Sequence, residues 1–322
     1  MKAIRIHTPG GPEALQYDDV AEPTPGAGQA VIKLAAAGVN FIDVYFRTGA
    51  YKAPLPLVLG LEGAGAVTAV GAGVTDVKVG DAVAWTGVPG SYAQMTAVPA
   101  DRLVKLPSGV APKDGAAAML QGMTAHYLVT SSYPLKTGDT CLVHAAAGGM
   151  GLLLCQMAKM LGATVIGTVS TEEKAALAKA AGADHVILYS TQDFEPEVKR
   201  ITGGRGVDVV YDGVGATTFD KSLSCLRPRG FMILFGAASG PVPPLDLQVI
   251  NVRGSLFLQR PSLNHHIAAR EELLQRAGAV LGWIRDGKIK LRIEHQFPLA
   301  QAADAHRALE GRKTTGKILL IP

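Results

Sequence analysis

Ala145-Ala146-Ala147-Gly148-Gly149-Met150-Gly151 is the stretch that decides the fold of this chain. It follows a short apolar run at residues 140–144 and precedes residues 152–161, whose leucines suit a helix with one polar flank. The order is therefore strand, glycine turn, helix. The spacing Ala-x-x-Gly-x-x-Gly lacks only the first glycine of the dinucleotide fingerprint, and small residues still let backbone N–H groups approach a pyrophosphate at the positive end of a helix. By itself the turn is weak evidence, because a plain tight turn in a Gly- and Ala-rich chain looks similar.

The segments after this turn alternate between strand-like and helix-like patterns. Five more strands are predicted, at residues 164–169, 185–188, 207–211, 231–235 and 255–258. Between them, residues 172–181, 194–201 and 217–226 have helical length and period. This alternation predicts an α/β fold with a Rossmann-type, doubly wound parallel sheet. An α/β domain without a nucleotide is the alternative, but the glycine turn falls on the first strand, where a dinucleotide site requires it.

Length and composition indicate an ordinary globular protein. The 322 residues suggest about two domains, and 48% hydrophobic against 18% charged residues allow large cores. The net charge is +4 without a basic tract, so nucleic acid and anionic membranes are not implied, whereas a phosphorylated cofactor is allowed. Residues 1–6 read as a strand and not as a signal peptide, so we expect a cytoplasmic protein. Cys141, Cys155 and Cys225 lie in predicted elements, which favours buried reduced thiols.

The N-terminal part has a different texture. Up to about residue 124, short alternating runs such as 30–34 and 64–70 are separated by Gly and Pro, which predicts an all-β domain. Residues 267–285 read as a long amphipathic helix and residues 316–321 as a final strand. Because this tail has no core of its own, we expect it to return to the N-terminal domain. The expected domains are then 1–124 with 265–322, interrupted by a nucleotide-binding domain at 125–264.

At this point the chain resembles a known family, the zinc-independent quinone oxidoreductases (zeta-crystallin-like) of the medium-chain dehydrogenase/reductase superfamily. The family's signature around the glycine turn matches Gly138-Asp139, Leu142, Ala146-Ala147-Gly148-Gly149, Gly151, Gln156 and Lys159. Segments 38–43, 47–51 and 260–263 also look like bacterial members, so the resemblance covers essentially the whole chain. It implies a Rossmann domain that is inserted in the sequence of a discontinuous catalytic domain, which forms a GroES-like β-barrel.

The resemblance also shows which metal ligands are missing. Zinc alcohol dehydrogenases of the superfamily carry Cys where Asn40 stands, His where Leu61 stands and a second Cys near Leu120. None of these three residues suits zinc, and residues 80–94 lack the cysteines of a structural zinc lobe. We therefore expect no metal. Without a Lewis acid, alcohol oxidation is disfavoured, whereas a quinone or an activated double bond accepts reducing equivalents with hydrogen-bond donors alone.

The nicotinamide cofactor is predicted from the end of the second strand. An acidic residue there would bind a ribose 2′-OH, but this chain has Val169 and Ser170, followed by Lys174. NADPH is therefore favoured over NADH. Hydrogen bonds to charged groups contribute about 1.5–3 kcal/mol each, so two such residues shift the preference strongly. A solvated helix residue is the less favoured interpretation of Lys174.

Further cofactor contacts are implied by the resemblance alone. Tyr127, Gly149 and Met150, beside Gly148 and Gly151, would contact the pyrophosphate, and Tyr189 the extra phosphate. Phe235, Gly236, Phe257 and Leu258 would lie near the nicotinamide or its ribose. Asn40, Phe41 and Tyr45 would also contact the cofactor. Arg312 would close over the cofactor.

For the substrate, the loop at residues 40–51 is the candidate, since it occupies the place of the absent zinc. Asn40 would bond the substrate or the nicotinamide ribose, and Tyr45 and Tyr51 would donate a proton or stack on a flat ring. Tyr51 reads equally as a loop residue. Asp43 and Glu62 are interpreted as structural carboxylates, and Gln121 as a further polar contact. No dedicated general acid stands out.

The predicted function is NADPH-dependent reduction of a quinone without zinc, by hydride or one-electron transfer. An enone or enal double-bond reductase is the nearest alternative. A non-catalytic NADPH-binding sensor or RNA binder is a hypothesis from another class, against which the lack of a basic, aromatic-interleaved surface argues. The apolar edge of the sixth strand predicts a homodimer.

Overall fold

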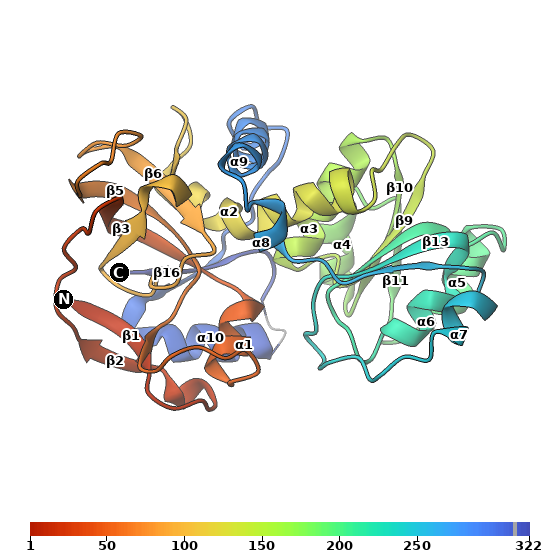
Figure 1. The fold of residues 1–322 in the computed structure, drawn as a ribbon. Coiled ribbons are helices and arrows are strands. Elements are labelled where there is room, and N and C mark those ends of the chain that lie inside the picture. Colours follow the sequence, from red (N-terminus) through yellow and green to blue (C-terminus); the bar gives the residue numbers. More distant parts are fainter. Residues whose placement is uncertain (312–313) are drawn as a thin grey trace. The chain divides into compact units, whose positions relative to one another are not determined.

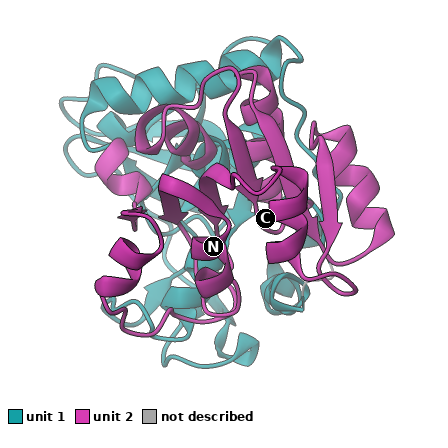
Figure 2. Ribbon diagram, turned by 90° about the vertical axis from the view of Figure 1, so that its right-hand side faces the viewer, with its two compact units in different colours: residues 1–123, 267–322 teal, residues 124–266 magenta. Residues whose placement is uncertain are grey.

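The computed structural model describes residues 1–311 and 314–322 (Figure 1). The chain forms two compact units, coloured separately in Figure 2. The first unit combines Met1–Met123 with Ile267–Pro322, and the second consists of Thr124–His266. The second unit is therefore inserted in the sequence of the first.

The second unit is built on a parallel sheet. Its strands are β9 (Thr140–Val143), β10 (Thr164–Val169), β11 (His185–Leu188), β12 (Val207–Asp212), β13 (Leu226–Leu234) and β14 (Phe257–Gln259). They pair in the order β11-β10-β9-β12-β13-β14, and every pair is parallel. This order confirms the predicted doubly wound sheet, in which ligands bind at the carboxyl edge where the order reverses, between β9 and β12.

Helices cover both faces of this sheet (Figure 1). α3 (Gly149–Met160) and α4 (Glu172–Ala180) lie on one face, and α5 (Phe194–Ile201) and α6 (Phe219–Ser224) on the other. Short helices α7 (Gln248–Val252) and α8 (Leu263–His266), which were not predicted, flank β14. A core under α5 and α6 includes Phe194, Val198, Val210, Phe219 and Leu223.

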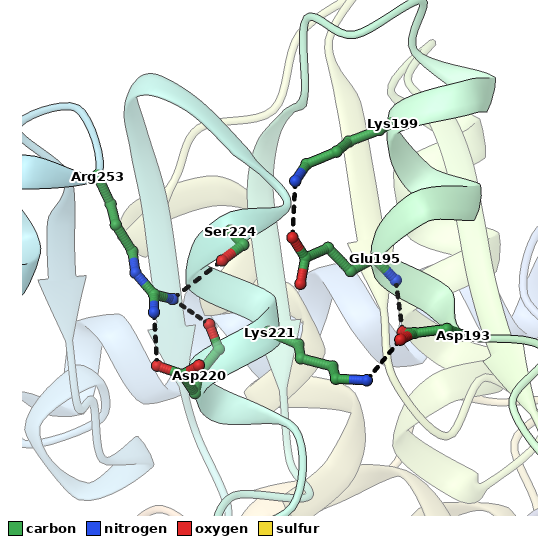
Figure 3. A network of polar contacts seen from close by, with 7 residues as sticks. All are labelled: Asp193, Glu195, Lys199, Asp220, Lys221, Ser224 and Arg253. Carbon is green, nitrogen blue, oxygen red and sulfur yellow. Dashed lines mark hydrogen bonds and ion pairs between the residues drawn. The ribbon is translucent and has the colours of Figure 1, made fainter.

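A polar network ties α5, α6 and the end of α7 together (Figure 3). Asp193 caps α5 and also accepts from Lys221 Nζ at 2.6 Å. Arg253 donates to Asp220 Oδ1 at 2.7 Å and to Ser224 Oγ at 3.1 Å. Exposed ion pairs contribute only about 0.2–1 kcal/mol each, so this network orients the helices more than it stabilises the fold.

The first unit contains two sheets. β1 (Lys2–Ile6) pairs with β2 (Gln16–Asp19) and β4 (Leu57–Val58). The larger sheet contains β15 (His295–Pro298), β16 (Ile318–Ile321), β3 (Gln29–Val39), β5 (Glu62–Val70), β6 (Ala82–Thr86) and β8 (Val104–Lys105), in that order, and β7 (Met95–Pro99) also pairs with β3. As predicted, the C-terminal strand returns to this unit, because β16 pairs with β3.

The all-β expectation for residues 1–124 was wrong in two places. The expected loop 40–51 contains helix α1 (Phe41–Arg47), which starts with a capping box formed by Asn40 and Asp43. Helix α2 (Pro112–Tyr127) has mostly small buried residues, so it shows no amphipathic stripe. Later in the chain, α9 (Arg270–Arg285) begins three residues after the predicted start, and α10 (Ala302–Glu310) was not predicted.

Candidate functional site

The glycine turn after β9 leads into helix α3, whose start has no side-chain cap. Gly148 is the N-cap of α3, no side chain caps this end, and the first turn carries no acidic residue. Ala145 has a φ of 52°, an uncommon conformation outside glycine. A Cβ on Gly151 would lie 2.3 Å from the carbonyl oxygen of Ala145, so only glycine lets α3 start this close to the strand end. The first N–H groups of α3 lack intrahelical partners, which fits a pyrophosphate.

Residues expected at the extra phosphate gather at the ends of β10 and β11. The backbone N–H of Tyr189 donates to the carbonyl of Val169 at 3.0 Å, and Ser190 Oγ donates to the carbonyl of Ser170 at 2.9 Å. Thr171 caps α4 by accepting from the backbone N–H of Lys174. Ser170, Lys174 and Tyr189 therefore share one edge of the sheet, and no carboxylate occupies the strand end itself. This arrangement fits a ribose 2′-phosphate.

The residues expected near the nicotinamide divide into two pairs. Phe235 and Gly236 follow β13 at the carboxyl edge, where the N–H of Phe235 donates to the carbonyl of Asp212 at 2.8 Å. Phe257 and Leu258 instead pair with Phe231 and Met232, away from this edge. The ring of Phe257 stacks on that of Phe231, with centroids 4.4 Å apart. Phe257 begins the three-residue strand β14, and Leu258 lies one residue before its end.

Gln259, which was not predicted as a site residue, ends β14 nearer that edge. Its Oε1 is buried and has no hydrogen-bond partner among the described residues. Tyr127 is buried, and one face of its ring stacks on that of His266, with the ring centroids 4.0 Å apart. Arg312 lies outside the described residues.

In the first unit, Asn40 and Glu62 belong to a buried cluster with Lys317. Asn40 follows β3, Glu62 begins β5 and Lys317 precedes β16. The antiparallel register pairs Ile318 with Val39, which brings Lys317 beside Asn40. Lys317 Nζ donates to Glu62 Oε2 at 2.5 Å and to Asn40 Oδ1 at 2.7 Å. No local sequence pattern points to Lys317, because its partners lie 255 and 277 residues away along the chain.

Helix α2 completes this cluster. Gln121 Nε2 donates to Asn40 Oδ1 at 3.1 Å, and the backbone N–H of Leu120 donates to Glu62 Oε1 at 2.6 Å. Asn40 Nδ2 donates to Glu62 Oε2 at 2.9 Å and to the carbonyl of Gly38 at 3.3 Å. Both donors and both lone pairs of the Asn40 amide are thus used within the protein.

A second group of buried, hydrogen-bonded side chains connects α1 with Tyr92 and His306. Tyr92 donates its hydroxyl to Asp43 Oδ2 at 3.0 Å and lies 3.2 Å from His306 Nε2, while Arg47 Nη1 lies 3.1 Å from His306 Nδ1. Burial raises the pKa of Asp43 to about 7, and Asp43 Oδ1 has no partner among the described residues. Burial, with nearby Arg47, lowers the pKa of His306 to about 3. His306 is therefore neutral, with Nδ1 accepting from Arg47, since a guanidinium only donates.

The aromatic residues of α1 lie together. The ring centroids of Tyr45 and Tyr51 are 5.3 Å apart and tilted by 58°. Tyr51 also meets Phe46 edge-on at 5.6 Å, and 41% of its surface is exposed. Phe41, the first residue of α1, is half-buried. Tyr51 thus offers an exposed ring beside that of Tyr45.

Comparison with known proteins identifies the family. Residues 26–108 match the alcohol dehydrogenase GroES-like domain, and residues 149–276 match the zinc-binding dehydrogenase family. The sequence is 45% identical to a quinone oxidoreductase of Pseudomonas aeruginosa over 100% of this chain and 99% of that protein. The chain belongs to the quinone oxidoreductase family of the medium-chain dehydrogenase/reductase superfamily.

Two more relatives of the chain inform the site. The crystal structure of the Escherichia coli quinone oxidoreductase complexed with NADPH superposes with a TM-score of 0.98 at 43% identity, covering 100% of both chains. A 2-haloacrylate reductase from Burkholderia is 45% identical over 99% of this chain and 98% of that protein. The family thus includes members named for quinones and one named for an activated alkene.

Zinc does not fit this member of the family. Leu61 and Leu120 offer no side-chain ligand, and Asn40 Oδ1 already accepts from Lys317 and Gln121. A cation beside Asn40 would also face the buried ammonium of Lys317. Within residues 1–311 and 314–322, no group of three or more His, Cys, Asp or Glu side chains is placed to hold a metal ion. In the same part of the chain, no helix is long and apolar enough to cross a membrane.

Proposed function

We propose that this protein is an NADPH-dependent quinone reductase that works without zinc. The observation that carries the proposal is the cluster around Asn40, where a carboxylate, two amides and a buried ammonium bond to one another and leave no set of metal ligands. A substrate that needs a Lewis acid would find none there. A quinone fits because its reduction delocalises charge onto oxygens that hydrogen-bond donors can stabilise.

The cofactor would use the second unit's loops. The N–H groups that start α3 would bind the pyrophosphate, and Ser170, Lys174 and Tyr189 the 2′-phosphate. NADPH, when bound, supplies reducing equivalents from C4 of its nicotinamide. Phe235 and Gly236, at the carboxyl edge, would adjoin the nicotinamide, with Gln259 Oε1 as an acceptor for its carboxamide.

On the substrate side, the exposed ring of Tyr51 with Tyr45 beside it provides a flat surface for a quinone. Phe41 lies at the start of the same helix. Because the Asn40 amide is fully bonded to protein, we assign its role to the support of Gln121 instead of direct substrate binding. Protonation of the reduced product by water requires no dedicated acid.

Reduction of an activated double bond is the second candidate. The 2-haloacrylate reductase relative favours it, since that protein is as similar to this chain as the quinone oxidoreductase of Pseudomonas aeruginosa. Both substrate classes carry a carbonyl oxygen that gains charge during reduction, so one donor arrangement serves either.

Parallel assays separate these candidates. NADPH oxidation would be followed with 1,4-benzoquinone and with a 2-alkenal, at matched enzyme concentrations. We expect the higher kcat/KM with benzoquinone. Turnover of the alkenal alone would replace the proposal with the second candidate.

We also propose a cytoplasmic homodimer. β14 is the edge strand of its sheet, and Phe257 and Leu258 are 51% and 42% exposed. An apolar unpaired edge favours association with the same strand of a second copy.

A further inference from the structure

The cluster around Asn40 contains a buried lysine to which the proposed reaction gives no role. Lys317 is 3% exposed, and its ammonium contacts both Glu62 and Asn40. Glu62 is completely buried, so the pair is held out of solvent. A buried ion pair contributes little net stability compared with well-packed apolar side chains. Stability alone therefore does not explain why Lys317 and Glu62 occupy this site.

The chemistry of this cluster fixes the orientation of one amide. An ammonium can only donate and a carboxylate can only accept, so Asn40 must point Oδ1 toward Lys317 and Nδ2 toward Glu62. Asn40 Oδ1 is then the acceptor that faces Gln121, which must donate through Nε2. One charged pair thus determines the direction of two successive amides.

The consequence reaches a half-buried side chain. Gln121 uses one N–H on Asn40, and its second N–H and its Oε1 have no protein partner among the described residues. A side-chain N–H that is held in place is a donor for an oxygen that gains negative charge during reduction. If the Asn40 amide were flipped, its Nδ2 would face Gln121 and the Gln121 amide would have to turn.

We infer that Lys317 is a positioning residue, which through Asn40 holds Gln121 with its free N–H directed at the carbonyl oxygen of the substrate. Lys317 itself touches no substrate. The inference rests on the proposed function for the identity of the substrate, but the orientation of the amides does not depend on turnover.

The activity test uses a pair of variants in the full-length enzyme. Lys317→Met removes the ammonium and leaves Glu62 as an uncompensated buried charge, so both melting temperature and kcat should fall. Glu62→Gln combined with Lys317→Met removes both charges and should recover the melting temperature. Its kcat should remain on the order of 100-fold below that of the wild type, because no charged pair then fixes the orientation of the Asn40 and Gln121 amides. Lys113→Met, an exposed lysine on α2, is the matched control and should keep wild-type kcat.

The outcomes discriminate between positioning and structure. If kcat recovers together with melting temperature in the double variant, or if Lys317→Met retains wild-type kcat, the inference is wrong. The affinity for NADPH should change less than about twofold in every variant, since the cluster lies outside the second unit. The acceptor is whichever of benzoquinone and alkenal the wild-type enzyme reduces, so a failure of the quinone proposal leaves this comparison intact.

A measurement without turnover completes the test. The chain has three asparagines, Asn40, Asn251 and Asn264, so protein labelled with 15N-asparagine gives few side-chain amide signals. The two Nδ2–H resonances of Asn40 should be sharp and protected from exchange in the wild type. They should broaden or shift in the double variant. Unchanged Asn40 resonances there would overturn the inference even if activity fell.

Discussion

Ser170 stands at the strand end where an acidic residue would bind an unphosphorylated ribose. Ser170→Asp should therefore weaken NADPH binding by about 10- to 100-fold, which corresponds to the loss of one charge-assisted hydrogen bond, and should leave NADH binding equal or stronger. Calorimetric titration with both coenzymes measures the change. Lys179→Ala, in the last turn of α4, is the control and should change the affinity for neither coenzyme. Equal weakening of both coenzymes would place the 2′-phosphate elsewhere.

His306 gives the fold a pH dependence. Its pKa is about 3 in the folded protein and near 6.5 when unfolded, so between these values only the unfolded chain binds the proton. Its contribution to stability is thus complete above pH 6.5 and is lost as the pH falls. Asp43 acts in the opposite direction between about pH 4 and 7, because its pKa is raised by burial.

Replacing the histidine isolates its part. His306→Gln should lose less stability than the wild type between pH 6.5 and 4.5, by about 2 kcal/mol at the slope of one proton. Urea unfolding at several pH values gives the comparison, with His185→Gln as an exposed control. Parallel pH profiles for His306→Gln and the wild type would show that His306 is not held neutral.

Site residues that lie close after a predicted strand could be predicted from the sequence. Hydrogen-bond partners that lie far apart along the chain could not. Ser170 and Gly148 follow from local order, since Ser170 comes directly after a predicted strand and Gly148 lies in the glycine turn after another. The hydrogen bonding of the Asn40 side-chain amide cannot be predicted in this way, because it depends on Gln121 and Lys317, which lie 81 and 277 residues away. Phe257 was assigned to the nicotinamide from family resemblance, whereas the register of β14 with β13 decides where it lies.

At the element scale, α3 depends on a close approach at Gly151. Gly151→Ala would bring Cβ within 2.3 Å of a backbone oxygen, so the helix start must shift, at a cost of about 1–3 kcal/mol of stability and with weaker NADPH binding. Gly278→Ala on α9 meets nothing within 4 Å and should instead stabilise by about 0.5–1 kcal/mol. Thermal unfolding of the two variants measures this difference. A Gly151→Ala protein as stable as wild type would contradict the packing described for the turn.

The elements that could be predicted have local signals in the sequence. β10 and β11 are apolar runs bounded by turns, and both match the prediction residue for residue. β13 starts five residues before the predicted strand, because Leu226 already pairs with Val207. The next pair is Phe231 with Val209, and residues 227–230 form an irregularity between these two pairs. Helix α1 was hidden for a different reason. Its capping box is present in the sequence, but the region was interpreted as a loop by analogy with a zinc site.

The edge strand β14 carries the prediction for self-association. Leu258→Lys puts a charge on the exposed strand and should shift the protein from dimer to monomer at micromolar concentration. Leu274→Lys is a matched control on α9, where the leucine is also 42% exposed, and should leave the assembly unchanged. Light scattering after size-exclusion chromatography distinguishes the two states. A wild-type protein that is already monomeric would remove the dimer proposal.

In the whole molecule, the parallel sheet of the second unit and the larger sheet of the first unit have different connectivity and different proposed roles. The parallel sheet of the second unit presents helix starts and strand ends, which suit phosphates. In the first unit, the C-terminal strand β16 pairs with β3, and this pairing places Lys317 beside Asn40. The alternation along the sequence predicts the first arrangement, but only the pairing of the two chain ends creates the second.

The most direct test of the account is the rate of NADPH oxidation with 1,4-benzoquinone by protein dialysed against a chelator, measured with and without added Zn²⁺. The cluster around Asn40 predicts full activity after chelation and no gain from zinc. Loss of activity on chelation with recovery on adding zinc would contradict the account.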